Sequence, residues 1–230
     1  MYSIFRNLAL ILISAKFFAL LARKCRAPQV VGEIIAGLVI GPCLLNLVQP
    51  SDSIAIFAEI GVVLLMFTTG LGTNLQELGK LKSFLGTTIV SAAVIDDVIG
   101  IVVLTCVLGA SGGTDTSLVD VLMDTVLFFI AAIVIGLIIH KAMLWLDRRN
   151  PHTQRITIVS LAFCFAMAYI AEQYFGIADI TGAYIAGIVL CSLEDAPYIE
   201  RRVDISGYML FSPVFFVSIG LKTDISGLTP

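Results

Sequence analysis

Two adjacent carboxylates, Asp96 and Asp97, lie near the middle of an apolar run from Leu85 to Leu108. The run is long enough to cross the hydrocarbon core of a bilayer, which takes about 20 mostly apolar residues. An ionised side chain at that depth costs from about 3 to more than about 10 kcal/mol, so acidic residues found there usually mark a pathway for ions or protons. The pair is therefore predicted to bind cations, to relay protons, or to do both.

The spacing of the two carboxylates suits exchange between a proton and a metal ion. Neighbouring residues on an α-helix point about 100° apart, so Asp96 and Asp97 can line one cavity without aiming at one point. Burial and mutual repulsion both disfavour the ionised form, and such a pair titrates as a coupled unit. Protons and a hard cation such as Na⁺ would then compete for the same oxygens. From that competition we predict that the site crosses the membrane with either protons or the metal ion bound.

The composition of the chain predicts a membrane protein around this site. Of its 230 residues, 58% are hydrophobic and 13% charged, and the mean hydropathy is +1.00. A soluble globular domain carries about 25% charged residues. The fold class is thus predicted to be all-α and polytopic, with about eight transmembrane helices. The predicted spans are Ile4–Ala22, Gln29–Val48, Ser53–Gly70, Leu85–Leu108, Leu118–Leu146, Arg155–Tyr174, Ala178–Leu193 and Gly207–Leu221.

The basic residues predict the orientation of these spans. They gather at every second connection, and the side of the membrane richer in Lys and Arg faces the cytoplasm. The N-terminus is therefore expected outside, in a protein of the cell's inner (plasma) membrane. The short basic clusters lie at membrane edges and indicate no nucleic-acid partner. The residues on the basic side are Arg23, Lys24, Arg26, Lys80, Lys82, Lys141, Arg148, Arg149, Arg155, Arg201 and Arg202.

An internal repeat runs through the chain. Gly32–Ile40 aligns with Gly182–Leu190, and Gly70–Leu75 aligns with Gly220–Ile225. Both pairs differ by 150 positions, and a shared offset is harder to obtain by chance than either match alone. With the predicted orientation, the second span and its counterpart, the seventh, run in opposite directions. Inverted repeats with glycine-interrupted helices are typical of secondary transporters, whose sites lie between the halves.

Four motifs carry a resemblance to a known family. Arg26–Pro42, Glu59–Leu71, Ala92–Gly100 and Pro213–Leu221 resemble, in the same order, segments of the monovalent cation:proton antiporters, the sodium/hydrogen exchanger-like superfamily. The two-aspartate form resembles the electrogenic branch. The resemblance implies exchange of Na⁺, or of Li⁺ or K⁺, against H⁺. It also implies that Asp97 is the primary ligand of the transported ion and that Asp96 pairs with a cationic side chain.

The resemblance also implies that the chain is shortened. After Lys80–Phe84 the pattern passes almost at once into the two-aspartate helix, so two spans, about 60 residues, are missing by the length of a span and its loops. Further spans would be expected after Pro230. The missing parts include both interrupted helices that frame the ion site and the helix with the balancing Lys or Arg. Lys222 is placed at a span end and is interpreted as an interfacial lysine rather than that cation.

The resulting organisation is a single membrane domain, residues 1–230. Residues 1–75 form a first scaffold repeat, 85–110 the core helix with the aspartates, 118–146 a linker helix, and 155–230 a second scaffold repeat. By resemblance, the scaffold makes a homodimer within the lipid bilayer. No enzymatic activity and no cofactor are expected.

Two alternatives stand beside the antiporter hypothesis. The first is a non-transporting remnant, or a scaffold that dimerises with a full-length relative. The second, more remote, is an intramembrane aspartyl protease, since two embedded aspartates can act as an acid/base dyad. Those enzymes carry the carboxylates on separate helices, in Tyr-Asp and Gly-x-Gly-Asp contexts that this chain lacks.

Three other acidic residues receive structural interpretations. Glu33 lies beside Gly32 near a span entrance and is interpreted as a hydrogen-bonding partner within the scaffold. Glu172 and Asp179 flank a short outer turn and are predicted to be solvated.

Overall fold

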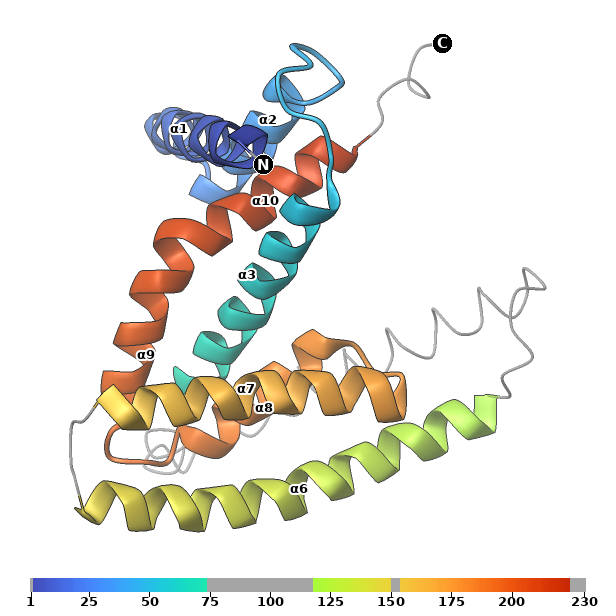
Figure 1. Ribbon diagram of the computed structural model, residues 1–230, viewed down its shortest axis with the longest axis vertical. Helices are drawn as coiled ribbons and strands as arrows, with labels where there is room; N and C mark the ends of the chain where they lie inside the picture. Colours follow the sequence, from blue (N-terminus) through green and yellow to red (C-terminus); the bar gives the residue numbers. More distant parts are fainter. Residues whose placement is uncertain (1, 74–117, 150–153, 224–230) are drawn as a thin grey trace. The chain divides into compact units, whose positions relative to one another are not determined.

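The computed structural model describes residues 2–73, 118–149 and 154–223, and all regular structure in these ranges is helical. The all-α class is thereby confirmed. The helices shown in Figure 1 are α1 (Tyr2–Lys24), α2 (Gln29–Ile40), α3 (Asp52–Leu71), α6 (Leu118–Arg149), α7 (Gln154–Phe175), α8 (Asp179–Leu190), α9 (Ala196–Ser206), the π-helical turn η1 (Gly207–Phe211) and α10 (Ser212–Lys222).

Five stretches of helix in the described ranges are long and apolar enough to cross a membrane. They are Ile4–Lys24, Asp52–Leu71, Val126–Met143, Arg155–Phe175 and Ala196–Lys222. Helices α2 and α8 have 12 residues each, which at 1.5 Å per residue gives about 18 Å, against a hydrocarbon core of about 30 Å. The predicted span Gln29–Val48 is therefore wrong in extent, since its helix ends at Ile40, whereas Ala178–Leu193 agrees within three residues with helix Asp179–Leu190. The predicted span Leu85–Leu108 lies outside the described residues.

Helix α2 ends early because Gly41 and Pro42 follow its last residue. Proline has no N–H and clashes with the preceding turn, so the helix cannot continue through it. The chain instead folds back: Leu45 N–H donates to the Val39 carbonyl at 3.0 Å, and Val48 N–H donates to the Ile40 carbonyl at 3.0 Å. These bonds satisfy carbonyls at the helix end that would otherwise be unpaired.

Helix α9 was not predicted, although its start carries a recognisable signal. Asp195 directly precedes the helix, and its carbonyl accepts hydrogen bonds from the N–H groups of Tyr198 and Ile199, both at 3.0 Å. Pro197 is the second helical residue. An acidic residue before the helix and a proline in its first turn are both favoured at helix starts.

The π-helical turn η1 joins α9 to α10 and has a local cause. Pro213, at the start of α10, cannot donate the usual bond to the residue four positions back. Ser212 N–H bonds instead to the Gly207 carbonyl, five positions back. Such turns relieve proline within otherwise continuous helices. The predicted span Gly207–Leu221 is thus the second half of a longer helical stretch.

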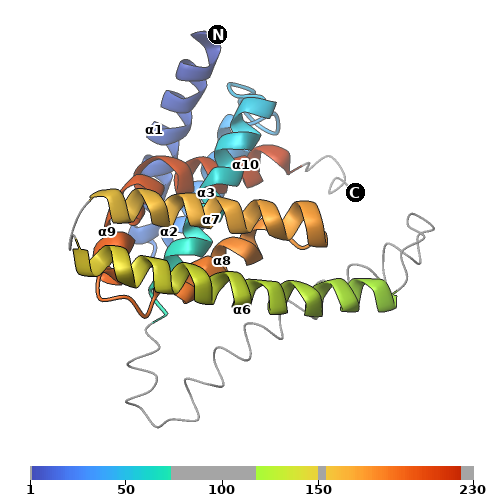
Figure 2. The same cartoon turned by 60° about the horizontal axis from the view of Figure 1, so that its bottom comes forward.

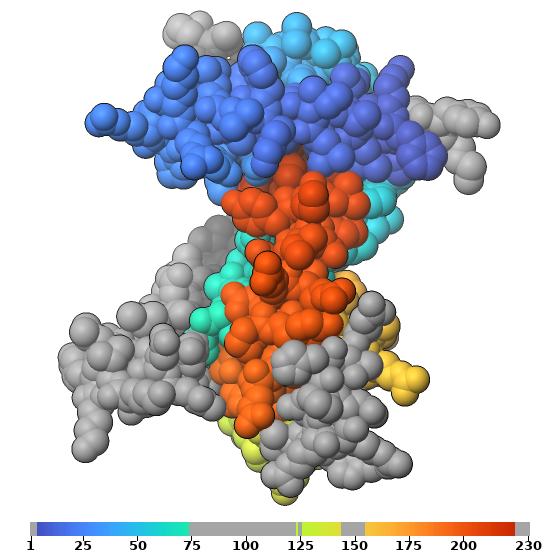
Figure 3. Space-filling view, turned by 90° about the vertical axis from the view of Figure 1, so that its left-hand side faces the viewer, coloured from blue at the N-terminus to red at the C-terminus, as the bar shows by residue number. Residues whose placement is uncertain are grey.

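The described chain divides into two compact units. Unit 1 comprises Met1–Leu65 and Asp204–Pro230, and unit 2 comprises Met66–Val203. In unit 1, α2 packs against both α1 and α10, as the blue and red side chains in Figure 3 show. The core of this unit is a cluster of small and branched apolar side chains: Ile11, Ala15, Ala36, Ile40, Val48, Ile54, Val214, Val217 and Leu221.

Unit 2 is built from α6, α7 and α8 together with the end of α3 and most of α9. Helices α6 and α7 run antiparallel, and α8 packs against both (Figures 1 and 2). The Phe128 ring on α6 meets the Phe175 ring of α7 edge-on, with centroids 5.5 Å apart. Phe128 is fully buried, so this pair fixes the outer helix against the rest of the unit.

The two units repeat one helix contact at the offset seen in the sequence. In unit 1, Gly37 of α2 packs against the Val217 carbonyl and Gly220, where a Cβ on Gly37 would lie 2.9 Å from the Gly220 Cα. In unit 2, Gly187 packs against the Phe67 carbonyl and Gly70, where a Cβ would lie 2.8 Å from the Gly70 Cα. Each residue of the second contact differs by 150 from its counterpart in the first. The partners are exchanged: α2 contacts a helix from the second half of the chain, and α8 contacts one from the first half.

A third glycine contact joins equivalent residues directly. Gly61 of α3 approaches the carbonyl of Phe211, 150 positions later, and a Cβ on Gly61 would lie 2.6 Å from that oxygen. Contact between a residue and its own equivalent is what an approximate two-fold axis produces. Leu64, further along α3, lies near Gly207, which precedes Phe211. Within unit 1 the equivalent helices therefore cross in opposite directions. Their orientation in a membrane stays a prediction.

Candidate functional site

The predicted ion-binding residues, Asp96 and Asp97, lie outside the described residues. Their role as ligands for Na⁺ and protons therefore stays a prediction from the sequence. The described helices include those predicted to form the scaffold repeats on both sides of this segment, together with α6, the predicted linker helix.

Two acidic residues in the described ranges are buried. Asp195 is 3% exposed and Glu33 is 9% exposed. Asp195 precedes α9, and its backbone carbonyl accepts hydrogen bonds from the first turn of that helix. Glu33 lies inside α2, in unit 1. The sequence predicts a structural role for Glu33, and the structure buries this carboxylate within an apolar helix.

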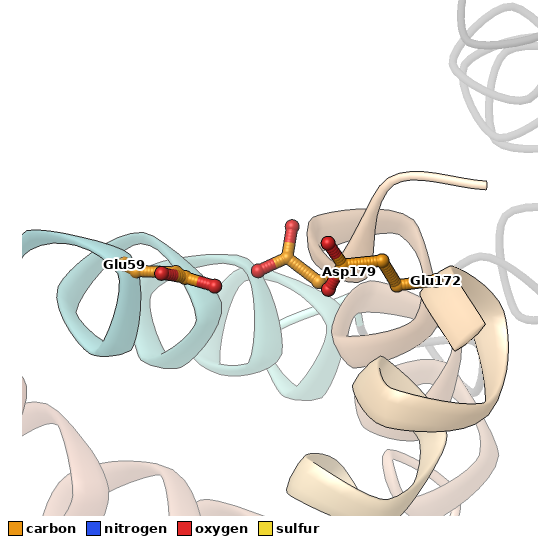
Figure 4. Close-up of side chains that lie close together, drawn as sticks. All are labelled: Glu59, Glu172 and Asp179. Atoms are coloured by element: carbon orange, nitrogen blue, oxygen red, sulfur yellow. The ribbon is translucent and has the colours of Figure 1, made fainter. Parts of the chain in front are cut away.

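The acidic residues at the α7–α8 turn are on the surface of unit 2. Glu172 is exposed and Asp179 partly exposed, and a carboxylate oxygen of each lies within 4.8 Å of the other (Figure 4). Asp179 also accepts a hydrogen bond from the Ile180 N–H at 2.8 Å, at the start of α8. This position suits a carboxylate because helix N-termini favour negative charge. Glu59, also labelled in Figure 4, belongs to α3 in unit 1 and forms no part of this turn.

Lys222 is the last residue of α10 and is exposed. Its position at a helix C-terminus is favourable for a cation, since the last carbonyls carry partial negative charge. In the structure Lys222 is therefore a residue at the end of a helix.

Comparison with known proteins assigns this helical membrane protein to a class. The model of the sodium/hydrogen exchanger transmembrane family matches residues 9–82 and 73–230, nearly the whole chain. The chain belongs to the sodium/hydrogen exchanger family. This confirms the resemblance carried by the four sequence motifs.

Several curated relatives are antiporters by name. The chain is 29% identical over 286 residues to the Na⁺/H⁺-K⁺ antiporter GerN of Bacillus cereus, a match that covers 99% of this chain and 73% of the relative. It is 26% identical over 280 residues to a Na⁺/H⁺ antiporter of Enterococcus hirae, covering 95% and 73%. It is 33% identical over 180 residues to the high-affinity Na⁺/H⁺ antiporter NhaS3 of Synechocystis, covering 76% and 38%.

The same matches locate an internal shortening. The family model matches in two pieces that meet at residues 73–82. The GerN alignment has 286 positions, and 99% of a 230-residue chain fills about 228 of them, so about 58 positions have no residue from this chain. This agrees in size and place with the two spans predicted to be missing after Lys80–Phe84.

Proposed function

We propose that this chain exchanges a monovalent cation, Na⁺ or otherwise Li⁺ or K⁺, for protons across a membrane. Family membership supports this proposal, as do the names of the relatives, which are Na⁺/H⁺ antiporters. Five stretches of the described helices have the length and polarity that membrane spans require. The observation that carries the proposal is a family match over nearly the whole chain, including the segment with the adjacent aspartates.

The aspartate pair would perform the exchange by alternating occupancy. Asp97 would bind the cation through its carboxylate oxygens, and protonation of the pair would release the cation. A hard monovalent cation prefers such oxygen ligands to sulfur or nitrogen. Because the two carboxylates interact, their protons would be bound and released as a unit. Asp96 would then set how readily its neighbour gives up a proton.

Fluorescence dequenching in everted vesicles tests this proposal. A pH gradient is established, and Na⁺, Li⁺ and K⁺ are added in turn. The expected result is cation-driven dequenching that Asp97→Asn abolishes and Asp96→Asn changes in its pH dependence. Glu172→Gln is the matched control, because it neutralises an exposed carboxylate at the α7–α8 turn and should leave exchange intact. Unchanged exchange in Asp97→Asn would refute the assignment.

A second candidate function is a dimerising scaffold without transport. The observation in its favour is the gap of about 58 alignment positions beside the predicted core helix. Wild-type vesicles without cation-driven dequenching, combined with a stable dimer by light scattering, would favour this reading. Robust dequenching would exclude it.

A further inference from the structure

Glu33 and Lys16 lie at the same level of the α1–α2 pair in unit 1. Gly32 brings the two helices into backbone contact, because it packs directly on the carbonyl of Phe18. Glu33 follows Gly32, and Lys16 lies two residues before Phe18. Glu33 is buried, Lys16 is exposed, and the charge of Lys16 acts on the Glu33 carboxylate. An apolar helix pair therefore contains one acid and one base close to the same glycine contact, with the base on one helix and the acid on the other.

The second repeat makes the same helix pair without these charges. There Gly182 packs on the carbonyl of Met167, as Gly32 packs on that of Phe18. The positions equivalent to Glu33 and Lys16, 150 residues later, are Ala183 and Ala166. Ala183 is fully buried and Ala166 is exposed, so both match the burial of their counterparts. The helix contact consequently forms with two alanines, and packing alone does not require the acid and the base.

A buried carboxylate that packing does not require calls for another role. A charge is costly away from water unless it is compensated. Among the described residues no hydrogen bond reaches the Glu33 carboxylate, so compensation falls to Lys16. Burial opposes ionisation of the acid and the neighbouring ammonium favours it, so the proton occupancy of Glu33 depends on Lys16.

The other charged groups on the elements packed against α2 are on α1 and α10. Of all of them, Lys16 is the one whose charge acts on Glu33 within the described chain. These groups are Arg6, Lys16, Arg23 and Lys24 of α1 and Lys222 of α10.

We propose that Glu33 is a second proton-binding carboxylate of this protein, held in unit 1 with Lys16 as its charge partner. The carboxylate takes up a proton from water and returns it there, and no other group is consumed. The proposal involves neither Asp96 nor Asp97, and it does not depend on whether the chain transports cations.

Infrared difference spectroscopy of the purified protein in liposomes, recorded as a function of pH, tests this site. A protonated carboxylic acid has a C=O stretching band that shifts in D₂O. The wild-type protein should show such a band, and Glu33→Gln should lose it. In Lys16→Met the band should titrate at higher pH, because the carboxylate has lost its positive neighbour. The Asp96→Asn/Asp97→Asn variant should retain the Glu33 band, which separates this test from the transport assay.

A double variant keeps the test decisive if Glu33→Gln does not fold. Lys16→Ala/Glu33→Ala gives the first repeat the two alanines of the second, and it should fold and lack the band. Two results would overturn the proposal: a Glu33→Gln spectrum identical to that of the wild type, or failure of the double variant to fold. The second result would show that the charge pair is needed for packing after all.

Discussion

Alanine at Gly37 should destabilise unit 1, because the new Cβ would enter a backbone contact. That atom would lie 2.9 Å from the Gly220 Cα and also meet the Val217 carbonyl. Carbon atoms are in optimal contact at about 3.5–4.0 Å, so α2 and α10 would have to separate by at least about 0.6 Å. Overpacking costs about 1–3 kcal/mol, and about 2–3 kcal/mol is expected here because the new Cβ meets backbone atoms, which cannot turn aside. The helix preference of alanine over glycine returns about 1 kcal/mol.

The net loss for Gly37→Ala is therefore about 1–2 kcal/mol, a factor of about 5–30 in the ratio of folded to unfolded protein. Thermal unfolding in detergent, followed by circular dichroism, should show a melting temperature lower by about 2–8 °C. Gly207→Ala is the matched control in the same unit, because its Cβ would lie 3.8 Å from the Leu64 Cβ, an ordinary contact. It should be neutral or slightly stabilising.

The repeat extends this prediction to unit 2. Gly187→Ala places its Cβ 2.8 Å from the Gly70 Cα, again in a backbone contact, so it should also cost about 1–2 kcal/mol. Equal melting temperatures for Gly37→Ala and Gly207→Ala would refute the reasoning for unit 1. If Gly187→Ala left the melting temperature unchanged while Gly37→Ala lowered it, the two contacts would not be equivalent.

Three further predictions concern other described side chains. The Phe57 and Phe211 rings are stacked with centroids 5.8 Å apart, so a double-mutant cycle with leucine should give a coupling of about 0.5–1.5 kcal/mol; additive effects would contradict the contact. Asp195→Ala should lower the free energy of unfolding, measured by thermal unfolding, by about 0.5–2 kcal/mol, the usual cost of alanine at the position before a helix, whereas Asp195→Asn should retain most of that free energy. Exposed Cys25 should react with a membrane-impermeant maleimide in everted vesicles but not in intact cells, with buried Cys164 unreactive in both; labelling of Cys25 in intact cells would contradict the predicted orientation.

The long helices could be predicted from the sequence because each is one uninterrupted apolar run. The predicted span Ile4–Ala22 is helix Tyr2–Lys24, and the predicted span Ser53–Gly70 is helix Asp52–Leu71. Lipid-spanning helices need such runs for their length alone. The ends of the predictions were close because charged or small residues follow the runs directly.

The short helices could not be predicted in the same way. Residues 44–48 include four apolar side chains and continue the hydrophobic run after α2, yet their backbone folds back onto Val39 and Ile40. Hydropathy measures transfer from water and contains no information on backbone direction. Gly41 and Pro42 carried that information and were included in the span rather than treated as its end.

The candidate sites also differ in how far they could be predicted from the sequence. Asp96 and Asp97 were identifiable because two charges in an apolar run are costly wherever the helix lies. The significance of Glu33 needed the structure, since only packing brings Lys16 of another helix beside it. The aligned repeats nevertheless place Ala183 and Ala166 at the positions of Glu33 and Lys16, so this difference between the repeats can be seen in the sequence alone.

The exchanged glycine contacts explain how the scaffold tolerates the internal shortening. Each contact joins a residue before the shortened segment to one after it: Gly37 with Gly220 in unit 1, and Gly70 with Gly187 in unit 2. Gly37 and Gly70 are thus covered by helices of the other half of the chain, so these contacts form only when both halves are folded. The family match breaks at residues 73–82, beyond the last of these glycines in the first half. A loss at that point removes none of the contacts that join the halves. If the loss is the two spans that the sequence predicts, the later helices would also keep their original direction.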